Sequence, residues 1–195
     1  ASPEATFRYA QEILMPFRRW DTVLEMMDYT DKIDPNNRRT ASLRGYVTRI
    51  RTLTAELERL EAKRSDPKTR LTDQEIFALA TCYYEMGRIG DAGQLVRALV
   101  DKLADAQTLQ LAAQMLADAH IDADAEKALS KYLRLRATDA NAWADLAKVQ
   151  QRQNKRKPAQ DSFIRAYQLD KNTIFSRLQK EQDLYDIAAP LFKAR

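Results

Sequence analysis

Apolar and small residues recur along the second half of the chain at the spacing of paired helices. One set, favouring two successive helices, is Trp143, Leu146, Ala147, Ala159, Phe163 and Ala166. The positions about one repeat earlier carry Leu109, Ala125 and Leu129, and those one repeat before them carry Ile76, Ala92 and Val96. Units in register predict a stack of helix hairpins, because a single hairpin cannot bury its apolar face alone.

These units resemble the tetratricopeptide (TPR) repeat family. The likeness rests on the bulky Trp143, the close-packing Leu146-Ala147 pair, the tight turn Met86-Gly87-Arg88 and the helix end at Leu169-Asp170. The resemblance implies an all-α fold, a right-handed superhelical stack of TPR-like helix hairpins with one long interrupting helix and a C-terminal capping helix. It also implies a non-catalytic scaffold that binds a protein or peptide partner in a concave groove.

The pattern divides residues 1–195 into the parts of a single α-solenoid. The segment Ile33-Asp34-Pro35 ends a first hairpin, in which Pro16 marks the turn, and no turn signal follows Ile50 until Ser65-Asp66-Pro67. The expected parts are an N-terminal hairpin at 4–37, a long basic helix and connector at 38–72, repeats at 73–105, 106–139 and 140–172, and capping helices at 173–195.

The long helix carries an apolar seam at alternating spacings of three and four. Its members are Leu43, Tyr46, Ile50, Leu53, Leu57 and Leu60. Such a seam must be covered, either by neighbouring helices of the same chain or by a second copy. Self-association through residues 43–60, giving a homodimer, is therefore an alternative function.

The last segment has the two faces that a terminal cap needs. The residues expected to point inward are Ile174, Phe175, Leu178, Leu184, Ile187, Leu191 and Phe192. Those expected to face water are Arg177, Lys180, Glu181, Asp183 and Asp186.

A binding groove is expected along the first helix of each repeat. The candidate groove residues are Gln74, Phe77, Thr81, Tyr84, Gln107, Gln110, Gln114, Asn141, Lys148, Gln151 and Arg152. Glutamine and asparagine both donate and accept hydrogen bonds, which suits an extended peptide backbone, while Phe77 and Tyr84 offer apolar anchorage. The alternative is a solvated helical face without a ligand. The family's clamp for a terminal carboxylate is absent, since its positions carry Phe77, Thr81, Leu111, Asn141 and Asp145.

Positive charge gathers on the long helix. Residues 38–70 hold ten Lys or Arg and four Asp or Glu, a local net charge of +6 against +4 for the whole chain. The candidate patch for an anionic partner is Arg38, Arg39, Arg44, Arg49 and Arg51. No aromatic stacking set accompanies it, so the patch does not indicate nucleic acid as a partner, and a solvated helix face is the favoured interpretation.

Catalytic and metal sites lack the necessary residues. With one histidine, His120, and one cysteine, Cys82, the common zinc sites cannot form, and nothing else in the sequence supports a Ser-His-Asp or a Cys-His arrangement. We expect no enzyme activity, cofactor or metal, a buried Cys82, and His120 at a helix end. The acidic cluster Asp118, Asp122, Asp124 and Glu126 lacks the glycine turn of a calcium loop, so Asp122 or Asp124 is expected to cap a helix.

No apolar run reaches the roughly 18 residues that span a bilayer, so no membrane insertion by this chain is expected. Residues 2–9 and the segment Arg19-Trp20-Asp21 resemble repeat tails of some bacterial membrane glycosyltransferase-like proteins. This resemblance implies an alternative role as a repeat domain appended to a larger protein for assembly. The expected location is the cytoplasm or the soluble part of a membrane-anchored protein.

Overall fold

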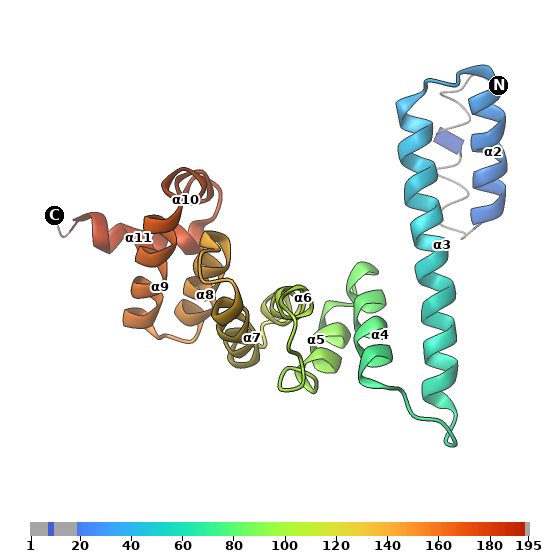
Figure 1. The fold of residues 1–195 in the computed structure, drawn as a ribbon. Coiled ribbons are helices and arrows are strands. Elements are labelled where there is room, and N and C mark those ends of the chain that lie inside the picture. The colour runs from blue at the N-terminus through green and yellow to red at the C-terminus, as the bar shows by residue number, and fades with distance from the viewer. Residues whose placement is uncertain (1–7, 10–18, 194–195) are drawn as a thin grey trace. The chain divides into compact units, whose positions relative to one another are not determined.

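The computed structural model describes residues 8–9 and 19–193, and every regular element in these ranges is helical, without any strand (Figure 1). The prediction of an all-α, solenoid-like fold is confirmed. The chain forms two compact units, Ala1–Arg70 and Leu71–Arg195. The first half of the expected N-terminal hairpin, including the turn at Pro16, lies outside the described residues.

The first unit contains helices α2 (Trp20–Ile33) and α3 (Arg38–Ser65). Asn37 caps α3 by accepting hydrogen bonds from the backbone amides of Arg39 and Thr40. The long helix expected within 38–72 is therefore present as α3.

The buried face of α3 differs in part from the predicted seam. Leu43 and Val47 pack against Val23 and Met27 of α2, whereas Tyr46 is 51% exposed. The prediction that Tyr46 is buried was wrong. Residues four apart share a helix face, and α2 covers the face that carries Leu43 and Val47. This part of the seam is thus covered within the chain.

The second unit is a run of helix hairpins (Figure 1). Its helices are α4 (Asp73–Glu85), α5 (Ile89–Arg97), α6 (Ala106–Asp118), α7 (Asp122–Leu135), α8 (Ala140–Arg152), α9 (Arg156–Leu169), α10 (Lys171–Leu178) and α11 (Gln182–Lys193). The pairs α4–α5, α6–α7 and α8–α9 make the most extensive contacts, and α11 packs more on α8 and α9 than on α10.

The first helix of every hairpin has a side-chain cap. Thr72 forms a capping box with Glu75, and Asp105, Asp139 and Asp170 accept hydrogen bonds from the amides three residues later. The second helices α5, α7 and α9 have no such cap. Their starts are instead fixed by the tight turn that precedes them.

That turn repeats with the same backbone geometry in three hairpins. Gly87, His120 and Asn154 have φ angles of 77°, 56° and 60°, in the left-handed region. The residue after each one donates its amide hydrogen to a carbonyl five positions earlier, at 2.8, 2.9 and 2.9 Å. This is the Schellman arrangement, which satisfies carbonyls at a helix C-terminus. His120 therefore lies just past the end of α6, as expected.

Small residues allow the hairpins to pack closely. Ala80, Ala112, Ala125 and Ala128 are fully buried in one continuous core cluster that extends from α4 to α8. Gly93 of α5 lies so close to the α6–α7 turn that an added Cβ would stand 2.5 Å from Ala119 Cβ. Cys82 is buried, as predicted.

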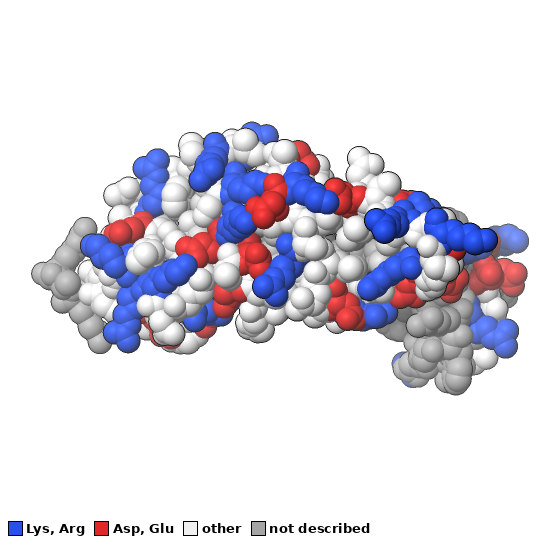
Figure 2. All heavy atoms as spheres, turned by 90° about the horizontal axis from the view of Figure 1, so that it is seen from below, with Lys and Arg blue, Asp and Glu red and all other residues white. Residues whose placement is uncertain are grey.

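Polar contacts join each hairpin to the next. Arg97 of α5 pairs with Asp124 of α7 at 3.0 Å, and the Lys131 ammonium donates to the Val100, Asp101 and Leu103 carbonyls at 2.6–3.0 Å. Positive and negative side chains are interspersed over these helices on the face drawn in Figure 2.

The acidic cluster takes part in these contacts. Neither Asp122 nor Asp124 caps a helix, because the N-cap of α7 is Ile121 and makes no side-chain cap bond. Asp122 accepts from Arg152, and Glu126 accepts from Lys155, Gln150 and Gln153. The capping prediction was wrong, because Asp122 and Asp124 lie inside α7, where Asp122 pairs with Arg152 of the following hairpin and Asp124 with Arg97 of the preceding one.

The terminal hairpin α10–α11 packs on α8 and α9 through Ile174, Leu184 and Ile187, each at most 2% exposed. Phe175 was wrongly assigned to the inward face, since it is 59% exposed. Leu178 and Leu191 are partly buried against the same cluster, and the side chain of Phe192 lies outside the described residues. The outer part of this cap is thus less polar than the sequence indicated.

Candidate functional site

A pocket of about 330 Å³ lies between α6, α7 and α8. It is lined by Gln110, Ala113, Gln114, Ala117, Asp118, Leu129, Asn141, Ala142, Asp145, Lys148, Val149 and Arg152. The predicted groove residues that it brings together are Gln110, Gln114, Asn141, Lys148 and Arg152. Two consecutive hairpins therefore contribute amide side chains to one cavity.

The other predicted groove residues lie outside this pocket. Gln74 and Gln107 are exposed, and Gln151 is half-buried. The Thr81 hydroxyl donates to the Phe77 carbonyl of its own helix at 2.9 Å. Phe77 and Tyr84 are partly buried and pack against the core cluster, so both side chains already have apolar neighbours within the chain.

Tyr84 connects the first helix of one hairpin to that of the next. Its hydroxyl donates to Asp118 Oδ2 at 2.6 Å. Burial raises the pKa of Tyr84 to about 12, and the hydrogen bond to Asp118 adds to this effect. Tyr84 thus holds Asp118, which lines the pocket, and is not itself a lining residue.

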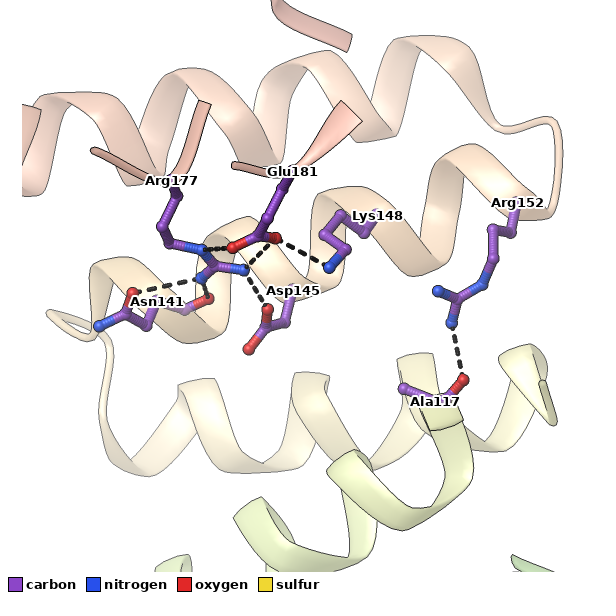
Figure 3. Close-up of polar contacts among 7 residues, drawn as sticks. All are labelled: Ala117, Asn141, Asp145, Lys148, Arg152, Arg177 and Glu181. Carbon is purple, nitrogen blue, oxygen red and sulfur yellow. Dashed lines mark hydrogen bonds and ion pairs between the residues drawn. The ribbon is translucent and has the colours of Figure 1, made fainter. Parts of the chain in front are cut away.

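Arg177 reaches back from α10 onto the groove face of α8 (Figure 3). Its guanidinium donates to Asp145 Oδ1 at 2.6 Å, to the Asn141 side-chain and backbone oxygens at 3.2 Å, and to Glu181 at 2.7 and 3.0 Å. Burial disfavours the charge of Arg177, but the hydrogen bonds to Glu181 and the charge of Asp145 outweigh it and raise the pKa of Arg177. The prediction that Arg177 and Glu181 face water was wrong.

Glu181 lies between two cations. Its carboxylate accepts from Arg177 and, at 2.9 Å, from the Lys148 ammonium (Figure 3). The hydrogen bond from Arg177 lowers the pKa of Glu181 to about 2, against the opposing effect of burial. Lys148 is therefore neutralised by the terminal hairpin.

Arg152 is neutralised by the preceding hairpin. Its Nε and Nη2 atoms donate to Asp122 Oδ1 at 2.8 and 2.6 Å, and Nη2 also donates to the Ala117 carbonyl at 3.2 Å. This carbonyl lies in the last turn of α6, where a cation interacts favourably with the helix dipole. Both cations that the sequence placed in the groove therefore have partners within the chain.

Sequence reasoning missed Asp118, Arg177 and Glu181 as parts of this site, and it named Asp145 only as a position at which the carboxylate clamp is absent. One local signal was available, since Arg177 and Glu181 are four residues apart and meet on one face of the chain. The others act across a distance of one repeat, as for Lys148 and Glu181, which are 33 residues apart. Pairing charges one period apart would have suggested these contacts.

The basic patch of α3 is partly neutralised by α2. Arg44 pairs with Asp28 and Asp31, both at 2.7 Å, and Arg51 pairs with Asp21 at 3.1 Å. Hydrogen bonds to Asp31 and Asp28 raise the pKa of Arg44. The positive charge that these arginines offer to an anionic partner is therefore smaller than the sequence count implied.

Two further findings concern residues 8–9 and 19–193. In these ranges no group of three or more His, Cys, Asp or Glu side chains is arranged to hold a metal ion. No helix there has the length and apolar character needed to cross a membrane.

No protein-family profile matches the chain, and no curated protein matches it. The resemblance of the N-terminal segment to glycosyltransferase-like repeat tails is therefore unsupported by these comparisons. Among solved structures, the crystal structure of MamA protein is similar to this chain, with 14% sequence identity and a TM-score of 0.48. That match covers 92% of this chain and 96% of the other.

Proposed function

We propose that this chain is a non-catalytic scaffold that holds an extended segment of a protein or peptide in the groove along α4, α6 and α8. The observation that carries the proposal is the pocket between α6 and α8, where Gln110, Gln114 and Asn141 converge from two hairpins. An extended backbone presents alternating donors and acceptors, and primary amides satisfy both.

The surroundings of the pocket favour binding without rearrangement. Lys148, Arg152 and Arg177 are held by ion pairs at 2.6–2.9 Å, and their side chains are 18–25% exposed. Side chains that are already ordered lose little conformational freedom when a ligand arrives. The pocket is therefore preorganised for a partner that uses a few anchors.

Site-specific photocrosslinking tests the proposal. A benzophenone amino acid at Gln114, in the pocket, is compared with the same group at Gln168, an exposed position on α9. We expect a partner segment to crosslink at position 114 and not at 168, and the double variant Gln110→Ala, Asn141→Ala to reduce capture of that segment in a pull-down. Phe77 and Tyr84 are avoided because truncating them would disturb the core.

Two results would contradict the proposal. One is equal crosslinking from positions 114 and 168, which would indicate adventitious capture. The other is full capture by the Gln110→Ala, Asn141→Ala variant with unchanged thermal stability, which would place the partner elsewhere on the chain.

A further inference from the structure

The carboxylates in and around the pocket outnumber the cations. The acidic groups are Asp118, Asp122, Asp145 and Glu181, and the basic ones are Lys148, Arg152 and Arg177. The four negative charges exceed the three positive charges by one. The whole chain, in contrast, carries a net charge of +4.

The excess negative charge belongs to Asp118. Its Oδ2 atom accepts from the neutral Tyr84 hydroxyl at 2.6 Å. In the described part of the chain, no lysine or arginine forms an ion pair with it. Asp145 is also accessible, since its side chain is 47% exposed and Arg177 contacts only its Oδ1 atom. Each carboxylate therefore has an oxygen that can accept from a ligand in the pocket.

The position of Asp118 adds to the negative potential. Asp118 is the last residue of α6, where the helix dipole is negative and an acidic side chain is unfavourable. Arg152 reduces the negative potential at this end of the helix by donating to the Ala117 carbonyl. Asp122 neutralises Arg152 in turn. A cation from outside the chain would interact with both the carboxylate and the helix end.

We infer that the pocket between α6 and α8 selects a lysine or arginine side chain of the bound segment. The inference rests on the proposed function and specifies its ligand. The cation of the ligand lies against Asp118, Asp145 accepts a further hydrogen bond, and Gln110 and Gln114 contact the adjoining backbone. A carboxylate ligand is disfavoured, because Lys148 and Arg152 are already paired.

Nuclear magnetic resonance titration of the full chain provides the test, with three small probes. They are the Nα-acetyl methylamides of lysine, glutamine and glutamate, which share a backbone and differ in the charge of the side chain. We expect the lysine probe to shift the backbone amides of residues 110–118 and 141–152. Its binding should be about fivefold tighter than that of the glutamine probe, the change that one exposed ion pair supports.

A matched pair of variants separates a ligand contact from a structural role. Asp118→Asn removes the charge but keeps an oxygen that accepts from Tyr84, so the contact between α4 and α6 is retained. We expect it to abolish the preference for the lysine probe over the glutamine probe. Asp161→Asn, at a side chain on α9 that is 62% exposed, should leave that preference unchanged.

Three outcomes would overturn the inference. Equal binding of the lysine and glutamine probes would remove the charge preference, while leaving an amide-lined peptide groove intact. An unchanged preference in Asp118→Asn would show that Asp118 only joins the hairpins. Absence of shifts in residues 110–118 and 141–152 with every probe would also refute the inference. The crosslinking at Gln114 would then test the proposed function separately.

Discussion

Replacing Gly93 with alanine should destabilise the second unit, although alanine is the better helix former. The new Cβ would lie 2.5 Å from Ala119 Cβ and 3.0 Å from Ile121 Cδ1. A Cβ atom is fixed to its backbone and cannot move by changing rotamer. The α5 helix must therefore shift away from the α6–α7 turn.

Two effects of opposite sign decide how much stability the Gly93→Ala variant loses. Removing glycine from a helix stabilises by about 1 kcal/mol. Overpacking a close contact costs about 1–3 kcal/mol, and the rigid backbone at Ala119 favours the upper end. We expect a net loss of about 2 kcal/mol, which corresponds to a fall in melting temperature of roughly 4–8 °C for a chain of this size.

Gly90 offers a matched control in the same helix. A Cβ at Gly90 meets nothing within 4 Å. The Gly90→Ala variant should therefore be as stable as the parent chain or more stable by up to about 1 kcal/mol. Urea unfolding followed by circular dichroism at 222 nm measures both variants, and equal stability of the two would refute the packing argument.

The remaining predictions concern charge and turn geometry. The pKa of Glu181 is lowered to about 2, so its contribution to stability is present above pH 4.5 and is lost as the pH falls toward 2. Glu181→Gln should lose less stability than the parent chain between pH 6 and pH 3 in urea unfolding, and an identical loss would contradict this. His120→Gly should raise the melting temperature by the equivalent of about 1 kcal/mol, because φ is 56° at this residue, and a decrease would argue against backbone strain. The pKa of Tyr84, followed by its ring carbon resonance, should fall below about 12 in Asp118→Asn but stay above 10, because burial still raises it, and no change would assign the shift to burial alone.

The hairpins of the second unit were predictable because burial repeats along the chain. Leu109, Leu129 and Phe163 were assigned to the apolar faces from spacing alone, and each is at most 4% exposed. A repeated apolar face leaves a periodic signal in the sequence, whichever helices cover it.

The sequence predicted the geometry of the turns only in part. Gly87 marked one of them, whereas His120 and Asn154 adopt the same left-handed geometry without glycine. The Schellman hydrogen bonds and the following hairpin fix this geometry, so a less favourable residue is tolerated there. Glycine therefore marked the turn at Gly87, and the helix end at His120 was also expected, whereas the left-handed geometry of His120 and Asn154 was not.

The charges of the site could not be assigned from composition. Arg177, Glu181 and Asp122 were expected to be solvated or to cap a helix, but each meets a side chain 30–36 residues away. Such contacts depend on how closely consecutive hairpins approach one another. The seam of α3 shows the same dependence, because the position of α2 decided that Val47 and not Tyr46 is buried.

The polar contacts between hairpins also restrict how the array can be rearranged. The turn geometry is shared, so the backbones of the hairpins are nearly interchangeable. Their partners are not, because Arg97 meets Asp124 at one boundary and Lys148 meets Glu181 at another. A duplicated, deleted or exchanged hairpin would leave the half-buried Asp124, Lys148 or Glu181 without its opposite charge, a mismatch that is more costly than an exposed one. The order of the hairpins is therefore encoded in their charges, while the shape of each hairpin is encoded in its apolar residues.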